Sequence, residues 1–212
     1  QDSIDYYLRY GFIPSSESIY LHIKQISPGE IIEIDTSNNT IKNRTKYYNL
    51  RIQREESSTD NIDINYLSDL IEESVKSRLI GDVPIGCFLS GGIDSSMIAA
   101  FAARNHNKKL KTFSIGFKDK NFDESLSAKN IARFLGTEHT EYIIGESELI
   151  DYIPEITNTW DQPFADSSQI PMLALCRMTS KEVKVCLSGD GADEMFGGYE
   201  RYRRTMIFAG IP

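Results

Sequence analysis

The sequence predicts an α/β fold built on a doubly wound parallel sheet. From about residue 63 onward, apolar runs of strand length alternate with segments of helical periodicity, which is typical of parallel strands joined by right-handed crossover helices. Two of these apolar runs lead into glycine-rich segments that carry hydroxyl and carboxylate side chains. Because ligands bind beyond the carboxyl ends of the strands in such sheets, we expect both segments at one ligand site.

The N-terminal part is predicted to be a small β-containing piece followed by a polar linker. We expect short elements at 2–10 and 19–26, and then a hairpin with strands at 31–35 and 41–48, because alternating apolar residues flank a turn-rich stretch. This piece has too few apolar residues for a core of its own. Residues 51–62 are polar and charged, and we interpret them as a linker.

The remainder of the chain is predicted to form the sheet and its helices. Each helix follows from apolar residues at helical spacing, and each strand follows from a short apolar or β-branched run. In chain order we expect helix 64–79, strand 83–89, helix 94–104, strand 111–117, helix 123–134, strand 138–144, helices 146–160 and 169–180, and strand 183–188.

Bulk composition excludes several classes of function. The chain has 212 residues, 40% hydrophobic and 25% charged, which is ordinary for a globular protein. Its net charge of −8 argues against a general nucleic-acid-binding or membrane-binding surface, so we expect neither partner. No secretory signal and no apolar run of transmembrane length appears. The start at Gln1, without a methionine, and the end just after a helical pattern suggest a piece of a longer protein.

The three cysteines show no metal-binding spacing. Cys87 and Cys186 lie inside apolar runs, where we expect buried structural thiols. This usage fits a reducing, cytoplasmic location.

The first glycine-rich segment, Ser90–Ser96, has the chemistry of a phosphate site. Two adjacent glycines permit close approach of a ligand to the backbone, and the helix that follows offers N–H groups to an anion. Three serine hydroxyls and the Asp94 carboxylate complete the segment, and Asp94 is a candidate Mg²⁺ ligand. It lacks the lysine of a Walker loop and does not match the dinucleotide fingerprint. The alternative is a plain strand-to-helix turn capped by Asp94.

The second segment, Leu187–Tyr199, is also a glycine-rich stretch after a strand, and it carries more acidic side chains. Asp190, Asp193 and Glu194 would repel one another if crowded, so a cation or a basic group is expected nearby. Mg²⁺ suits such a site because it combines few carboxylates with phosphate oxygens. The alternative is a solvated acidic turn at the surface. We disfavour this alternative because the second segment is expected to lie beside the first one.

Two motifs identify a family. Ser90–Ser95 resembles the SGGxDS pyrophosphate loop of the ATP-pyrophosphatase superfamily, and Ser188–Tyr199 is similar to the S-G-[DE]-G-[SAG]-D-E-L-F-x-G-Y signature of the asparagine-synthetase family. With DQPFADSSQIP at 161–171, the resemblance covers nearly the whole chain. It implies a sheet of the adenine-nucleotide α-hydrolase (ATP-pyrophosphatase) type.

Residues 9–35 and the pair Tyr47-Tyr48 resemble the end of the glutaminase domain in glutamine-dependent asparagine synthetases. The resemblance therefore divides the chain into the end of a glutaminase domain (1–50), a linker (51–62) and the N-terminal part of a synthetase domain (63–212). The family's glutaminase nucleophile is an N-terminal cysteine upstream of this chain. Gln1 has no such chemistry, so we do not expect this piece to hydrolyse glutamine.

The resemblance also assigns roles residue by residue. Ser90, Asp94 and Asp193 are the implied catalytic residues, with Asp94 and Asp193 holding Mg²⁺. Asp190 is an implied cofactor-binding residue, at a position where many members have glutamate. The positions implied to line the adenosine site are Phe88, Ile115, Ser188 and Gly189, and those of the pyrophosphate loop are Ser90, Gly91, Gly92, Asp94, Ser95 and Ser96.

The implied reaction consumes ATP with Mg²⁺. The carboxylate of aspartate attacks the α-phosphorus, pyrophosphate leaves, and ammonia from glutamine displaces AMP from β-aspartyl-AMP. A family lysine and much of the amino-acid pocket would lie beyond Pro212, so we do not expect the piece alone to turn over. Two alternatives stay open: an amidotransferase acting on another carboxylate, such as a surface-polysaccharide sugar, and a non-catalytic nucleotide-binding module. A homodimer of the full-length protein also stays open.

Overall fold

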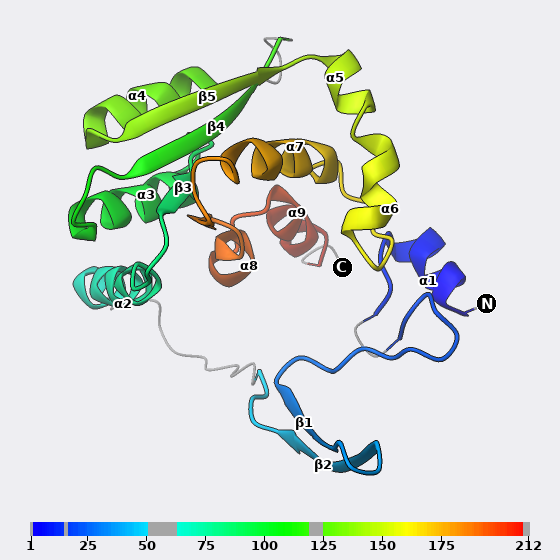
Figure 1. The fold of residues 1–212 in the computed structure, drawn as a ribbon. Coiled ribbons are helices and arrows are strands. Elements are labelled where there is room, and N and C mark those ends of the chain that lie inside the picture. Colours follow the sequence, from blue (N-terminus) through cyan, green and yellow to red (C-terminus); the bar gives the residue numbers. More distant parts are fainter. Residues whose placement is uncertain (1, 15–16, 51–62, 119–124, 210–212) are drawn as a thin grey trace. The chain divides into compact units, whose positions relative to one another are not determined.

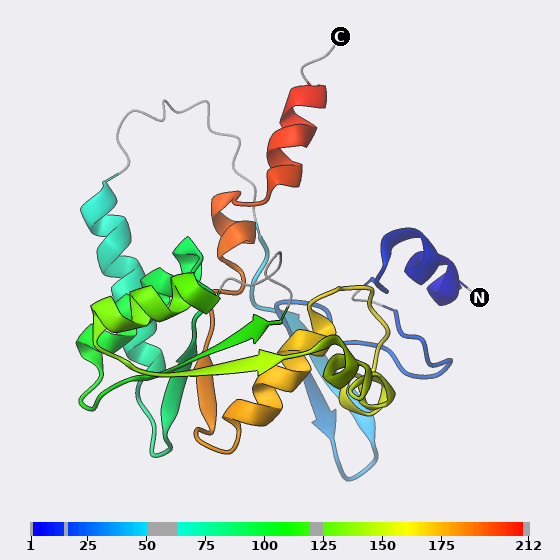
Figure 2. The same cartoon turned by 90° about the horizontal axis from the view of Figure 1, so that it is seen from above.

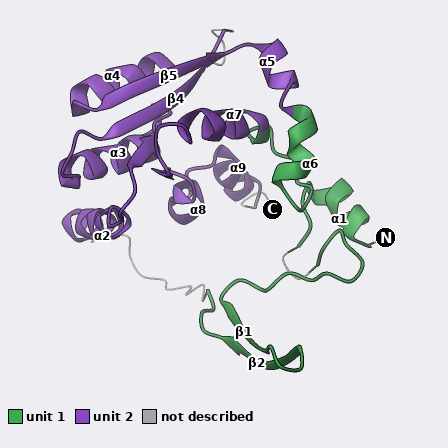
Figure 3. Cartoon of the chain, viewed as in Figure 1, with its two compact units in different colours: residues 1–61, 153–169 green, residues 62–152, 170–212 purple. Residues whose placement is uncertain are grey.

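The computed structural model describes residues 2–14, 17–50, 63–118 and 125–209. The chain divides into two compact units (Figure 3), with residues 1–61 and 153–169 in unit 1 and residues 62–152 and 170–212 in unit 2. The predicted linker 51–62 lies outside the described residues, as do the first two residues of the predicted helix 123–134. The predicted domain boundaries stay a prediction.

Unit 2 contains the predicted parallel sheet. Its strands are β3 (Ile85–Phe88), β4 (Lys111–Phe117), β5 (Glu138–Ile144) and β6 (Val185–Leu187), and they lie in the order β5-β4-β3-β6 (Figure 1). Every neighbouring pair in this sheet is parallel. β4 and β5 have the predicted bounds, whereas β3 and β6 are shorter than predicted.

Helices cover both faces of this sheet, which confirms the doubly wound class (Figure 2). On one face α2 (Ile64–Arg78), α3 (Ile93–Asn105) and α4 (Ser125–Leu135) pack through small and aliphatic side chains. On the other face α7 (Gln169–Thr179) contributes Leu175 to a cluster around Phe113, whose ring is completely buried. Burial of one such ring contributes about 1.5–3 kcal/mol.

The strand order creates a switch point between β3 and β6. From β3 the chain moves outward through α3 to β4 and through α4 to β5. It then returns by way of α7 to β6 on the other side of β3. The connection that leaves β3 therefore runs toward one side of the sheet, and β6 is added on the opposite side of β3. In open α/β sheets the crevice outside such a point is the usual ligand site.

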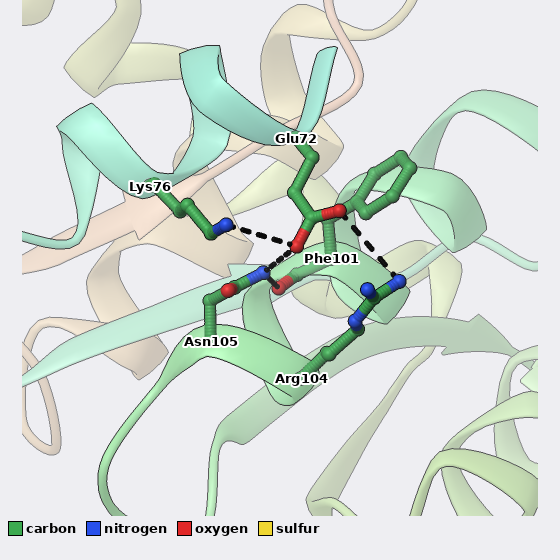
Figure 4. Close-up of polar contacts among 5 residues, drawn as sticks. All are labelled: Glu72, Lys76, Phe101, Arg104 and Asn105. Atoms are coloured by element: carbon green, nitrogen blue, oxygen red, sulfur yellow. Dashed lines mark hydrogen bonds and ion pairs between the residues drawn. The ribbon is translucent and has the colours of Figure 1, made fainter. Parts of the chain in front are cut away.

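A buried carboxylate joins α2 to α3 (Figure 4). Glu72 of α2 is 8% exposed and accepts a hydrogen bond from Asn105 Nδ2 at 2.8 Å. The same carboxylate lies 3.3 Å from Lys76 Nζ and 3.6 Å from an Arg104 nitrogen. The Asn105 hydrogen bond, with help from these cations, lowers the pKa of Glu72. The contact fixes the C-terminal end of α3, the helix whose other end carries the Ser90–Ser96 segment.

We expect His139 to make the stability of unit 2 depend on pH. Its ring lies 3.0 Å from Thr112 Oγ1 and 3.2 Å from Ser114 Oγ, and burial lowers its pKa. The unfolded chain therefore takes up a proton first as the pH falls through about 6.5. We expect the urea midpoint to fall between pH 7.5 and pH 5.5, and the His139→Gln variant to lose most of this slope. His22→Gln, at an exposed position, is the control and should keep it; an equal slope in both variants would contradict the assignment.

Unit 1 contains the predicted hairpin and two groups of short helices. Its elements are α1 (Asp2–Tyr10), β1 (Glu30–Asp35), β2 (Thr40–Lys46), the 3₁₀ turn η2 (Ile153–Glu155) and α6 (Ile156–Thr159). Within its described part Ile13 is the only buried apolar side chain, in keeping with the prediction that the N-terminal piece has too few apolar residues for a core of its own. The element predicted at 19–26 is wrong, because this stretch holds neither helix nor strand.

The helix predicted at 146–160 is also wrong as one continuous helix. The structure has α5 (Glu146–Ile150), then η2 and α6, with turns at residues 151–152. Pro154 explains the break, because proline offers no N–H to the preceding turn and disfavours helical torsions at the residue before it. The prediction for the thiols holds for Cys87, which is fully buried, but Cys186 is only half-buried.

Candidate functional site

The Ser90–Ser96 segment forms a tight turn between β3 and α3. Leu89, 1% exposed, donates its N–H to Phe113 O at 2.8 Å and anchors the turn in the sheet. Gly91 has φ +89°, a left-handed torsion that side chains disfavour. A methyl group there would also lie 2.7 Å from Ser127 Cβ of α4. The backbone at this position therefore requires glycine.

The serine hydroxyls brace this turn internally. Ser95 Oγ accepts the N–H of Ser90 at 3.2 Å and lies 2.9 Å from Ser90 Oγ. Ser90 Oγ in turn accepts the N–H of Gly92 at 3.3 Å, and Ser96 Oγ donates to Gly92 O at 2.5 Å. These contacts hold the turn in one shape before any ligand arrives. Gly92 is the N-cap of α3 and makes no side-chain cap, so the alternative reading of Asp94 as the cap is wrong.

The second segment continues from β6 into a short helix that the sequence did not predict. Ser188 Oγ donates to Asp190 Oδ2 at 3.1 Å directly after the strand. The helix α8 (Ala192–Phe196) lies between Gly191 at φ +93° and Gly197 at φ +71°. Asp193 and Glu194 occupy its first turn. What the sequence presents as an acidic turn is thus one helical turn with a left-handed glycine at each end.

Glu194 already has partners within the chain. Its Oε1 accepts a hydrogen bond from Tyr199 Oη at 2.7 Å. That bond lowers the pKa of Glu194, with help from the nearby Arg201 guanidinium. The same bond raises the pKa of Tyr199 to about 12, an effect that the Arg201 charge opposes. Arg201 stacks over the Tyr199 ring at 4.2 Å. Arg201 is therefore the basic group expected near the acidic segment; sequence reasoning had not singled out Arg201 or Tyr199.

The two segments meet at Gly189. A methyl group on this residue would lie 2.8 Å from the amide nitrogen of Ser95 and 3.1 Å from Asp94 Cβ. Since real side-chain carbons do not approach this closely, only glycine allows the two backbones to touch. The register of β3 and β6, with Cys87 paired to Leu187, delivers both segments to the same edge of the sheet. The structure therefore brings the two motifs together at the switch point.

Phe88 and Ile115 lie together on the α7 face of the sheet. Both are half-buried and pack against the cluster of Phe113, Leu175 and Val183. Phe88 is the last residue of β3 and pairs with Phe113 of β4. These predicted adenosine-site residues thus share one apolar surface that continues to the Ser90 turn.

The metal prediction rests on two carboxylates. Across the part of the chain that is described, no group of three or more His, Cys, Asp or Glu side chains is placed to hold a metal ion. Asp94 lies in the first turn of α3 and Asp193 in the first turn of α8, and Gly189 lies against Asp94. Two hard oxygen ligands fit Mg²⁺, which keeps several waters and takes the rest of its ligands from phosphates.

Within the described ranges, no helix has both the length and the apolar character needed to cross a membrane.

The chain is similar to known proteins over most of its length. The asparagine synthase family model matches residues 66–211. The chain is similar to asparagine synthetase [glutamine-hydrolyzing] 1 of Bacillus subtilis, at 36% identity over 97% of this chain and 32% of the relative. It is also similar to a putative asparagine synthetase [glutamine-hydrolyzing] 2 of Methanocaldococcus jannaschii, at 35% identity over 94% of this chain and 38% of the relative. The chain thus spans about a third of the length of these curated relatives.

Among solved structures, an NH3-dependent NAD synthetase from Campylobacter jejuni in complex with nitrate aligns with a TM-score of 0.48. It shares 18% sequence identity, and the alignment covers 65% of this chain and 61% of that chain. The family model, which covers well over half of the sequence, and the curated relatives agree with each other: this chain belongs to the asparagine synthase family.

Proposed function

We propose that the chain carries the ATP-binding part of a glutamine-hydrolysing asparagine synthetase. The observation that supports this most is the contact of Gly189 with Asp94 and Ser95, because it joins two independent ligand-type segments at the switch point of the sheet. The family membership and the names of the curated relatives support the same activity. In this proposal residues 1–50 end a glutaminase domain, 51–62 link it, and 63–212 begin the synthetase domain.

The Ser90 turn would hold the pyrophosphate of ATP. Its first-turn N–H groups have no acceptor within α3, and the helix dipole favours an anion there. The internal hydroxyl contacts keep Ser90, Gly91 and Gly92 in position, so binding needs little reorganisation. Ser95 and Ser96 brace the turn from the helix side.

The remaining predicted residues would bind the other parts of the nucleotide and its metal ion. Phe88 and Ile115 offer an apolar surface for the adenine, and Ser188 with Gly189 would line the adenosine next to it. Asp190, exposed after the end of β6 and bonded to Ser188, would also bind the nucleotide. Asp94 and Asp193 would hold Mg²⁺, which when bound neutralises charge on the phosphates.

The chemistry that this chain supplies is positioning and charge neutralisation. A carboxylate of aspartate must approach the α-phosphorus in line with the departing pyrophosphate. The turn fixes the leaving group, and its backbone N–H groups are aimed at charge that grows as the pyrophosphate departs. Ammonia would then displace AMP from the acyl-adenylate, and its supply from glutamine would depend on chain outside these residues.

The decisive measurement is aspartate-dependent exchange of labelled pyrophosphate into ATP, carried out with the complete protein and without glutamine. The proposal expects exchange with aspartate and at most a tenth of that rate without it. Exchange that does not depend on aspartate would mean that the acceptor is another carboxylate. Absence of both exchange and Mg·ATP binding would leave a protein without the proposed activity.

A further inference from the structure

We infer that Ser127 of α4 is a further ligand-binding residue, whose hydroxyl donates a hydrogen bond to the pyrophosphate part of ATP. Ser127 lies in the first turn of α4, outside both glycine-rich segments and in the same compact unit as the Ser90–Ser96 turn. The inference rests on the proposed function, because it adds a donor to the pyrophosphate site proposed above.

The topology of unit 2 brings the start of α4 to the edge of the sheet where the Ser90–Ser96 turn lies. Because β4 and β5 are parallel, the connection through α4 leaves the carboxyl end of β4 and returns to the amino end of β5. The Ser90–Ser96 turn follows the carboxyl end of β3, which is parallel to β4 and next to it. α3 and α4 also cover the same face of the sheet (Figure 2).

Gly91 lies directly against the first turn of α4. A methyl group at Gly91 would lie 2.7 Å from Ser127 Cβ and 3.0 Å from the amide nitrogen of Ala128. Ala128 is completely buried in the cluster that joins α3 to α4, so the core holds this contact in place. Since Cα–Cβ bonds in a helix tilt toward its N-terminal end, the Ser127 side chain is directed toward the edge of the sheet that carries the proposed pyrophosphate site.

The serine hydroxyls within the turn already donate their hydrogens inside it. Ser95 and Ser96 both donate to Gly92 O. Because a hydroxyl has one hydrogen to donate, Ser90 is then the donor in its 2.9 Å contact with Ser95 Oγ. Ser127 is exposed, and among the described residues its hydroxyl has no hydrogen-bond partner. It is therefore a hydroxyl beside the turn that can donate to a ligand without breaking an existing bond.

The charge of the turn makes such a donor matter. The segment Ser90–Ser96 contains an aspartate and neither lysine nor arginine. Hydrogen bonds to a charged oxygen are stronger than those between neutral groups. One additional hydroxyl is therefore expected to have a measurable effect on the binding of pyrophosphate.

The experiment measures three dissociation constants of the complete protein by isothermal titration calorimetry with Mg²⁺ present. The ligands are pyrophosphate, the α,β-methylene analogue of ATP, and AMP. In Ser127→Ala we expect the Kd of pyrophosphate and of the analogue to rise about ten-fold, the usual effect of losing one hydrogen bond to a charged group. The Kd of AMP should stay within about two-fold, because AMP lacks the phosphates that Ser127 contacts.

Two further variants test the assignment. Ser127→Asp should raise the Kd of pyrophosphate more than Ser127→Ala does, because it places a negative charge beside the phosphates. Ser77→Ala is the matched control and should leave all three constants unchanged. Ser77 is an exposed serine in the last turn of α2, before the chain enters the amino end of β3 at the opposite edge of the sheet. Alanine at 127 keeps the Cβ that packs on Gly91 and favours a helix, so the urea midpoint should not fall.

The outcomes separate this inference from the proposed function. Unchanged constants for pyrophosphate and the analogue in Ser127→Ala would overturn the role of Ser127 and leave the nucleotide site standing. An equal rise for AMP and pyrophosphate would also overturn it, because the substitution would then disturb the whole site and not one phosphate contact. Failure of the wild type to bind the analogue would refute the nucleotide site itself.

Discussion

Gly189→Ala is expected to reduce aspartate-dependent pyrophosphate exchange by about 100-fold, the usual effect of a misplacement near 1 Å at a reacting centre. The added methyl group would meet the Ser95 amide nitrogen at 2.8 Å and Asp94 Cβ at 3.1 Å. Gly189 has no positive φ, so alanine is not strained by its own torsions. The two segments must therefore separate, and the effect falls on the site rather than on the local backbone.

The matched control is Gly81→Ala. Gly81 is exposed, and a methyl group there meets nothing within 4 Å, so exchange should stay within about two-fold of wild type, the range of ordinary surface substitutions. The urea midpoint of Gly189→Ala should remain close to that of the wild type, which shows that the sheet is intact. Full exchange activity in Gly189→Ala would mean that the two segments do not form one site.

Most of unit 2 could be predicted from the sequence because its signals are local. β4 and β5 are short apolar and β-branched runs, and each starts shortly after a clear helix end, such as Gly136 at φ +68° after α4. The parallel direction of the strands followed from the alternation of strand and helix. The two glycine-rich segments could likewise be placed at one edge, because each directly follows a strand of the same sheet.

Unit 1 could not be predicted to the same extent because its organisation depends on distant contacts. No local pattern indicates that Gln162 docks on Ser18 and Ile19, which precede it by more than a hundred residues. The stretch at 19–26 has apolar residues but no helix or strand, and its first residue, Ile19, donates its N–H to Gln162. The break in the predicted helix 146–160 is different, because its signal is local. Pro154 itself disfavours a continuous helix, although the apolar residues around it have helical spacing.

The site itself shows the same division. Residue types and their order indicated a phosphate turn and an acidic segment, but not which carboxylate is free to act. The structure separates them, because Glu194 is bonded to Tyr199 at 2.7 Å and lies near Arg201, whereas Asp193 is not in that pair. The distinction arises from Tyr199, whose hydroxyl reaches back over α8, and α8 itself was not predicted.

Asp193→Asn is therefore expected to have the second large effect. Asparagine keeps the size of the side chain but removes the negative charge, and a neutral amide is a poorer ligand for a hard cation. We expect exchange to fall by roughly 100-fold or more at 1 mM Mg²⁺, as for loss of a preorganised charged group. Raising the Mg²⁺ concentration should restore part of the activity. Asp94→Asn should show the same magnesium dependence.

Glu194→Gln is the matched control for the loss of one negative charge. It neutralises the neighbouring carboxylate, which already accepts a hydrogen bond from Tyr199. It should lower exchange by no more than about three-fold, with no change in the Mg²⁺ requirement, as expected for a paired, exposed acid. Asp193 is held in place by its backbone, since its carbonyl accepts the N–H groups of Gly197 and Gly198, and the asparagine variant keeps both. Loss of activity in Asp193→Asn is thus a loss of charge and not of position. If Glu194→Gln proved the more damaging change, or if Mg²⁺ rescued neither aspartate variant, the metal would have to be held by other residues.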